Sequence, residues 1–177
     1  MLYFLADTHF NHANIIKYSK RPFPDVESMN KFLLDNWIDT VKPEDTVIFV
    51  GDFAMGRYEH LLYKVVQKSN TIFIRGNHDK KLVLPYGNLN QSVNVASAGG
   101  TQFIVTHDPD EVSRDYRGWI IHGHHHNNFP DRYPFFNPDQ KTINVSVDMI
   151  GFRPISMDEI MRVMHGGVWM TTRDEKP

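Results

Sequence analysis

The sequence contains no cysteine, and this absence removes one class of chemistry altogether. Neither disulfide bonds nor thiolate ligands are available, so any metal ion must be held by nitrogen and oxygen donors. No apolar run approaches the roughly 18 residues that a membrane-spanning helix requires. No basic segment with a cleavable apolar segment precedes the first apolar run, which starts at Leu2. We therefore expect a soluble, cytoplasmic protein that does not act on a membrane.

The chain also lacks a strong charge of either sign. Its 19 lysines and arginines nearly balance 21 aspartates and glutamates, which gives a formal net charge of -2 at pH 7. A protein that holds long nucleic acids by their phosphate backbone usually presents a basic face, so we do not expect such a partner. A small phosphorylated substrate remains compatible with this charge. No heptad pattern is present, and the oligomeric state stays open.

Short apolar runs rich in Val, Ile, Phe and Thr recur along the sequence and predict buried strands. The expected strands are residues 2–6, 46–50, 71–75, 92–98, 101–106, 119–122, 142–147 and 168–171, and the expected helices are residues 15–19, 25–41, 58–69 and 156–164. Residues 129–139 are rich in Pro, Asn and Asp and are expected to form a surface loop. Strands and helices alternate early in the chain, and strands follow one another later. This order predicts one α/β (α+β) domain, residues 1–177, with two mixed β-sheets packed as a sandwich and flanked by helices.

Five of the apolar runs end in Asp, Asn or His residues. A side chain just past the end of a strand points into the crevice where sheet proteins bind their ligands. Two divalent ions that share a carboxylate need that bridging acid and about three further ligands each. Side chains two residues apart in an extended chain project the same way, so the two pairs with this spacing are expected to converge. The candidates are Asp7, His9, Asp52, Asn77, His107, His124 and His126.

The ordered set of clusters resembles the calcineurin-like metallophosphoesterases. That family carries D-x-H, G-D, G-N-H-[DE], a lone His and G-H-x-H, in this order. The corresponding residues here, which span residues 7–126, are Asp7-Thr8-His9, Gly51-Asp52, Gly76-Asn77-His78-Asp79, His107 and Gly123-His124-His125-His126. The segment Phe10–Phe23 also resembles small phage and bacterial members of the family.

The resemblance implies two metal sites that share one carboxylate. One ion would be held by Asp7, His9, Asp52 and His126, and the other by Asp52, Asn77, His107 and His124. A hydroxide between the ions would attack phosphorus in line with the leaving oxygen. His78 looks like the residue that contacts the phosphate and protonates the leaving group. Asp79 would orient His78, because a carboxylate can fix the tautomer of an imidazole.

By the same resemblance, the activity would be hydrolysis of phosphate esters. Phosphodiesters are preferred, because a general acid such as His78 helps most when the leaving group is a poor alkoxide. An open site without a cap domain would suit nucleotides or short oligonucleotide ends. His12, Arg21 and Arg75 are candidate substrate contacts. Manganese is the expected metal, with Fe, Zn, Ni or Co as alternatives for a site without thiolates.

Each cluster also has an ordinary interpretation. Asp7 and His9 are suited to capping a helix, Gly-Asp and Gly-Asn are common turn pairs, and residues 122–126 could form an exposed loop. The joint occurrence of all five clusters in one order favours the metal centre. Three other functions stay open: a phosphomonoesterase, a non-catalytic scaffold that binds a partner through the same fold, and a nuclease within a larger assembly. The intact set of ligands argues against the scaffold.

Overall fold

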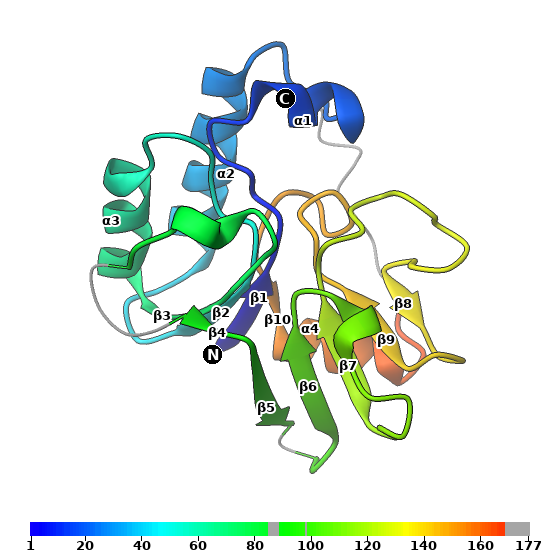
Figure 1. Ribbon diagram of the computed structural model, residues 1–177. Helices are drawn as coiled ribbons and strands as arrows, with labels where there is room; N and C mark the ends of the chain where they lie inside the picture. Colours follow the sequence, from blue (N-terminus) through cyan, green and yellow to red (C-terminus); the bar gives the residue numbers. More distant parts are fainter. Residues whose placement is uncertain (85–88, 98, 169–177) are drawn as a thin grey trace.

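The computed structural model describes residues 1–84, 89–97 and 99–168 of the chain. Within these residues, ten strands form two five-stranded mixed sheets that share one hydrophobic core (Figure 1). The first sheet has the order β10 (Ile155–Ser156), β1 (Leu2–Leu5), β2 (Thr46–Val50), β3 (Asn70–Ile74), β4 (Leu89–Asn90). The second has the order β5 (Ser92–Ala96), β6 (Gln102–Thr106), β7 (Trp119–His122), β9 (Thr142–Asn144), β8 (Phe136–Asn137).

The central strands of both sheets are parallel. In the first sheet β1, β2, β3 and β4 run in one direction, and β10 is antiparallel to β1. In the second sheet β6, β7 and β9 are parallel, and β5 and β8 flank them antiparallel. Parallel strands that are covered on both faces are apolar along their whole length, which explains the continuous runs at 2–5 and 46–50. Their carboxyl ends meet at one edge of the molecule.

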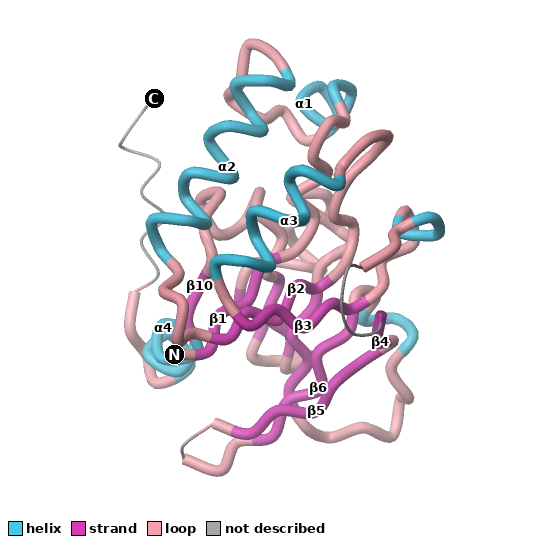
Figure 2. The backbone as a smooth tube through the Cα atoms, turned by 90° about the vertical axis from the view of Figure 1, so that its left-hand side faces the viewer, coloured by secondary structure: helices cyan, strands magenta, loops and turns pink. Residues whose placement is uncertain are grey.

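The helices lie outside the sheets. They are α1 (Ala13–Tyr18), α2 (Val26–Thr40), α3 (Glu59–Lys68) and α4 (Met157–Met164), with short 3-10 turns η1 (Asp79–Lys81) and η2 (Pro109–Glu111). Figure 2 shows α2 and α3 over one face of the first sheet. Asp25 caps α2, because its side chain accepts a hydrogen bond from the backbone N–H of Ser28 at 2.7 Å. A complete capping box between Ser156 and Glu159 starts α4.

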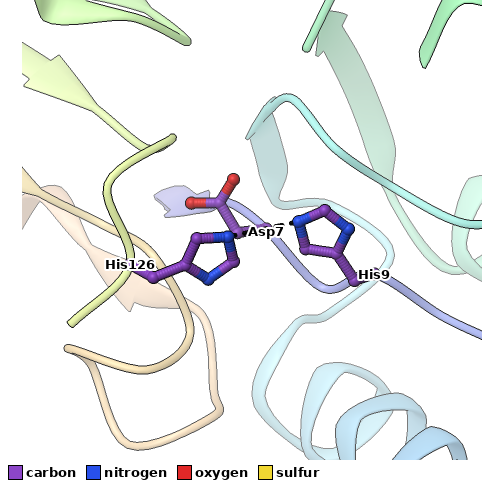
Figure 3. Close-up of side chains that lie close together, drawn as sticks. All are labelled: Asp7, His9 and His126. Atoms are coloured by element: carbon purple, nitrogen blue, oxygen red, sulfur yellow. Dashed lines mark hydrogen bonds between the residues drawn. The ribbon is translucent and has the colours of Figure 1, made fainter. Parts of the chain in front are cut away.

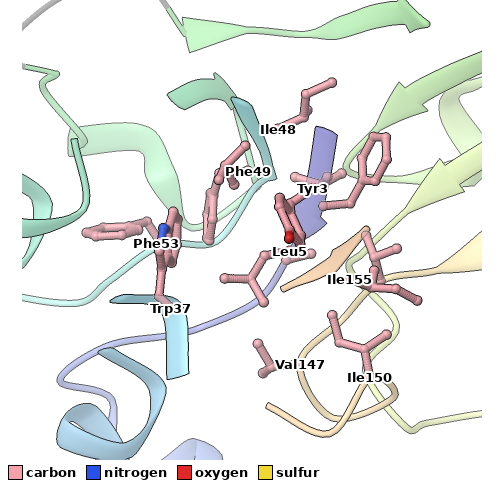
Figure 4. Close-up of a cluster of buried hydrophobic side chains, with 14 of the residues drawn as sticks. Tyr3, Leu5, Trp37, Ile48, Phe49, Phe53, Val147, Ile150 and Ile155 are labelled. Atoms are coloured by element: carbon pink, nitrogen blue, oxygen red, sulfur yellow. The ribbon is translucent and has the colours of Figure 1, made fainter. Parts of the chain in front are cut away.

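Aromatic side chains fill the layer between the helices and the first sheet. The ring of Trp37 in α2 stacks on Phe49 in β2, with centroids 5.8 Å apart, and Phe53 packs edge-on against the same Phe49 (Figure 4). All three side chains are fully buried. Because side chains alternate along a strand, Ile48 points to the opposite face of β2, into the core that the second sheet shares.

Backbone hydrogen bonds join the two sheets just before the first polar cluster. The N–H of Ala6 donates to Val145 O, and the N–H of Val147 donates to Ala6 O, each at 3.0 Å. The residue that follows β1 is therefore tied to the segment that follows β9. This connection holds the carboxyl ends of the two sheets side by side.

The predicted fold class is confirmed, and most predicted elements lie within a few residues of the observed ones. The sequence did not reveal β4, β8 and β10, which are two residues long and too short to show a period; β8 lies in the expected loop 129–139. The expected strand 168–171 falls almost wholly outside the described residues. Among the described residues, no helix has the length and apolar character needed to cross a membrane.

Candidate metal centre

The seven candidate ligands all follow strands or lie in the loops beyond them, at the shared carboxyl edge of the two sheets. Five of them have backbone φ angles in the left-handed region: Asp7 at 59°, His9 at 48°, Asp52 at 60°, His124 at 72° and His126 at 51°. This conformation is uncommon for residues other than glycine and tends to occur at functional sites. The prediction that the pairs at i and i+2 converge through an extended chain was therefore wrong in its reason. Left-handed backbone conformations orient these side chains toward the cluster instead.

The first group of donors is formed by Asp7, His9 and His126 (Figure 3). One ligand atom from each of these buried residues lies within 4.8 Å of the others. The Nε2 atoms of His9 and His126 are 3.2 Å apart, and Asp52 Oδ2 lies 3.5 Å from His9 Nε2. The four residues predicted for the first ion are thus brought together.

The second group lies on the other side of Asp52. His107 Nε2 is 3.5 Å from Asp52 Oδ2 and 3.0 Å from Asn77 Oδ1. The same Asn77 oxygen lies 3.1 Å from His124 Nδ1. The four residues predicted for the second ion are therefore also adjacent. Asp52 Oδ2 is 3.5 Å from an imidazole nitrogen in each group, which is the position a bridging ligand requires.

Hydrogen bonds fix which nitrogen of two imidazoles faces the cluster. His107 donates its Nδ1–H to Val50 O at 2.8 Å, and His126 donates its Nδ1–H to Asp148 Oδ2 at 2.7 Å. A neutral imidazole that donates through Nδ1 carries its lone pair on Nε2. In both residues this lone pair points into the cluster, as a metal ligand requires.

Burial and neighbouring charges have opposite effects on the pKa values within the cluster. Burial lowers the pKa of His9 to about 2 and raises the pKa of Asp7. Burial also disfavours the charged form of His107, but its hydrogen bond to Asp52 and the charge of Asp7 outweigh this and raise its pKa to about 9. A proton on His107 thus partly balances the two buried carboxylates. A divalent cation would supply the same balance more fully.

Asp7 provides a direct test of whether the residues fit metal ions. Its Oδ2 accepts a hydrogen bond from the backbone N–H of His124 at 2.9 Å and another from the hydroxyl of Ser146. Its Oδ1 is buried and, within the described part of the chain, has no hydrogen-bond partner. A buried carboxylate oxygen without a partner is costly unless a cation satisfies it. The donor set, nitrogen and oxygen only, fits borderline divalent ions.

His78 and Asp79 differ in burial and in the groups that they contact. The His78 side chain is exposed, and its ring lies edge-on to His9 with centroids 5.3 Å apart. Asp79 is buried and does not point its carboxylate at His78. It accepts hydrogen bonds from the backbone N–H groups of Asp52 at 2.7 Å, Phe53 at 2.9 Å and Gly76 at 2.9 Å. In place of the predicted orientation of His78, Asp79 holds together the two loops that carry Asp52 and Asn77.

Arg21 is placed differently from the prediction of a substrate contact. Its guanidinium is fully buried and forms a bidentate ion pair with Asp148, with Nε–Oδ1 and Nη2–Oδ2 distances of 2.9 and 3.0 Å. It also donates to Thr8 O at 2.9 Å and to Asp7 O at 2.7 Å. Arg21 therefore supports the Asp7–His9 turn from inside the protein.

The other two predicted substrate contacts remain on the surface. His12 is half-buried, and its ring centroid lies 5.5 Å from that of His9, at the edge of the cluster. Arg75 directly follows β3, and its side chain is exposed. His12 is thus partly accessible beside a candidate ligand, whereas Arg21 is fully buried.

Asp148 and Ser146 are the residues that the sequence reasoning missed. Ser146 donates its hydroxyl to Asp7, and Asp148 joins His126 to Arg21. Burial alone would raise the pKa of Asp148, but the charge of Arg21 and the hydrogen bond from His126 lower it. Both residues lie just beyond β9. Asp148 directly follows the expected strand 142–147, which was the available signal, whereas Ser146 falls inside that range.

Glycine allows the loops around the cluster to approach closely. A Cβ atom on Gly76 would lie 2.1 Å from Asp52 Oδ1, and one on Gly123 would lie 2.7 Å from Asp7 Oδ2. Both glycines precede predicted ligands in the sequence. A larger residue at either position would displace a candidate ligand carboxylate.

Comparisons with known proteins identify a matching family and two similar proteins. Residues 1–144 match the calcineurin-like phosphoesterase superfamily domain. An uncharacterized protein from Methanocaldococcus jannaschii is 42% identical over 170 residues, which cover 94% of this chain and 92% of that protein. The crystal structure of a protein of unknown function from Aquifex aeolicus matches with a TM-score of 0.70 and 24% identity, over 92% of this chain and 98% of that chain. At that identity the structural likeness shows the fold alone.

Proposed function

Because the chain belongs to the calcineurin-like phosphoesterase superfamily, we propose that it is a two-metal phosphoesterase that prefers phosphodiesters of nucleotide or short-oligonucleotide type. Its two mixed sheets with flanking helices are the fold of that family. Family membership supports metal-dependent phosphoester hydrolysis in general. The observation that carries the two-metal proposal is Asp52 Oδ2, which lies 3.5 Å from His9 Nε2 and 3.5 Å from His107 Nε2.

In this proposal two groups of side chains hold the ions. The first consists of Asp7, His9, Asp52 and His126, and the second of Asp52, Asn77, His107 and His124. When bound, two divalent ions supply neutralisation of the phosphoryl charge and activation of the attacking water. The chain contributes the rigid placement of the ligands. Manganese is the proposed ion, although the nitrogen and oxygen donors also suit Fe, Co, Ni and Zn.

His78 is the proposed general acid. Its side chain is exposed beside the first group, and its backbone N–H donates to Asp52 Oδ1 at 2.8 Å, which ties its position to the bridging carboxylate. An imidazole there can donate a proton to the leaving alkoxide oxygen of a substrate bound across the cluster. This step matters most for an unactivated leaving group. His12, half-buried beside His9, is proposed to contact the substrate.

The test is hydrolysis of bis-p-nitrophenyl phosphate and p-nitrophenyl phosphate by EDTA-stripped protein, with and without added Mn²⁺. The His78→Ala variant removes the proposed acid, and we expect a loss of about 100- to 10,000-fold in turnover of a dinucleotide, whose leaving group is an unactivated alkoxide. The loss with bis-p-nitrophenyl phosphate should be smaller, because p-nitrophenolate leaves without protonation. His60→Ala, an exposed histidine on α3, is the matched control and should keep full activity.

Each outcome decides one part of the proposal. Mn²⁺-dependent hydrolysis of both diesters, with dinucleotide turnover lost in His78→Ala and kept in His60→Ala, supports all of it. Hydrolysis of the monoester alone overturns the diester preference. Two bound ions without turnover of either ester would contradict the assignment as a phosphoesterase and favour the scaffold.

A further inference from the structure

A third group of side chains that could bind a metal ion adjoins the second group and shares His124 with it. Asp108, His124 and His125 each offer a donor atom, and these atoms lie within 4.8 Å of one another. The group is open to ions, because the side chains of His124 and Asp108 are 30% and 27% exposed. Two imidazoles and one carboxylate are a common protein ligand set for Zn²⁺, with water in the remaining position.

The members of this group are held in place by contacts on their far sides. Asp108 Oδ1 accepts a hydrogen bond from the backbone N–H of Asp110 at 2.9 Å, which leaves Oδ2 directed at His124 Nε2, 3.8 Å away. The ring of His125 stacks on Tyr133 with centroids 3.6 Å apart and planes 13° apart. Tyr133 in turn donates its hydroxyl to Asp110 at 2.9 Å. The group is therefore preorganised.

His125 carries a polar atom that nothing else in the described chain satisfies. Its Nε2 is buried and has no hydrogen-bond partner within the described residues. Its ring lies 4.8 Å from that of His124, and neither His125 nor Asp108 belongs to the proposed catalytic centre. One ring nitrogen of His125 lies within 4.8 Å of donor atoms of Asp108 and His124, and a neutral imidazole can offer a lone pair to a cation bound among them.

His124 is the residue that connects this group with the catalytic centre. Its Nδ1 faces Asn77 Oδ1 at 3.1 Å, and its Nε2 faces Asp108. A neutral imidazole has only one nitrogen lone pair, because the other nitrogen carries the proton. As a neutral imidazole, His124 therefore binds an ion through Nδ1 or through Nε2, and not through both.

We propose that Asp108, His124 and His125 form an inhibitory site for a borderline divalent cation of the Zn²⁺ type, which withdraws His124 from the catalytic centre. This inference rests on the proposed role of His124 in the second metal group. An ion bound at the outer site takes the Nε2 lone pair, and the proton moves to Nδ1, which then no longer coordinates the second ion. Excess metal thus lowers the activity that the first two ions support.

The experiment is a Zn²⁺ titration of the metal-free full chain, followed by calorimetry and by diester turnover. Two variants remove donors and keep the local packing. Asp108→Asn retains the acceptor for the N–H of Asp110, and His125→Phe retains a ring on Tyr133. Asp115→Asn, an exposed acid on the same loop, is the control.

For the wild type we expect a weaker binding phase after two equivalents, together with a fall in turnover over the same range. Asp108→Asn and His125→Phe should lose that phase or weaken it by at least about tenfold, and their turnover should reach a plateau. Asp115→Asn should behave as the wild type. No third phase in the wild type, or an equal third phase in the two variants, would overturn the proposal. A third phase that depends on Asp108 in a protein without turnover would instead retain this site and refute the proposed function.

Discussion

Replacement of Asp148 by asparagine tests the support behind the metal centre. The side chains of Arg21 and Asp148 are 0% and 1% exposed, and the Asp148 carboxylate accepts two bonds from Arg21 and one from His126. An asparagine keeps the shape of the side chain but removes its charge, and it turns an amide N–H₂ toward donors. A buried guanidinium then remains without a counter-charge.

The magnitude follows from that burial. Loss of one partner of a buried ion pair costs about 3–5 kcal/mol, which is a large part of the roughly 5–15 kcal/mol that stabilises a typical domain. The change also removes the carboxylate that fixes the tautomer of His126. Loss of such a partner of a ligand histidine typically weakens metal affinity by about 10- to 100-fold. We expect this weakening at the first metal group and not at the second.

Urea unfolding of the metal-free protein measures the first effect, and calorimetric titration with Mn²⁺ measures the second. The control is Asp35→Asn, which breaks the exposed ion pair between Lys31 and Asp35 and should leave both quantities unchanged. A stability change below about 1 kcal/mol for Asp148→Asn would refute the reasoning about burial. An equal loss of affinity at both metal groups would refute the specific link to His126.

Three further changes test the loops and one helix. Asp79→Asn should destabilise the protein by about 1–3 kcal/mol in urea unfolding, because one of three backbone N–H groups loses its acceptor; an unchanged midpoint would contradict that role. Gly76→Ala should abolish Mn²⁺ binding in calorimetry, since its Cβ would lie 2.1 Å from Asp52 Oδ1, whereas Gly99→Ala meets nothing nearer than 3.9 Å and should bind normally. Ser156→Ala removes the cap of α4 and should cost about 1 kcal/mol in thermal unfolding, and a Tm equal to that of the wild type would argue against the cap.

Local patterns were sufficient to predict the strands and helices that carry the centre. The run at 46–50 coincides with β2, and the capping box at Ser156 marks the start of α4. These features depend on residues near each other in the sequence, so periodicity and capping chemistry reveal them. Strands of two residues, such as β10, are defined by their partners and have no pattern of their own.

The roles of Arg21 and Asp79 could not be predicted, because they depend on distant parts of the chain. Arg21 meets Asp148, which is 127 residues away, and a sequence does not show whether an arginine faces a ligand or a buried carboxylate. Asp79 acts on backbone N–H groups of the loop at 52–53, and backbone groups leave no trace in the sequence. The left-handed turns at Asp7 and Asp52 were likewise invisible, since these residues also occur in ordinary turns.

The junction between the two sheets has a consequence for the order in which the candidate metal ligands are synthesised. Asp7, Asp52 and Asn77 follow strands of the first sheet, whereas His107, His124 and His126 follow strands of the second. Backbone hydrogen bonds between Ala6 and residues 145–147 join the sheets at this edge. The residues that complete this connection are therefore synthesised long after the first candidate ligand. A half-synthesised chain would carry the carboxylates with His9 alone of the four candidate imidazole ligands. Tight metal uptake would therefore distinguish the completed chain from a partly synthesised one.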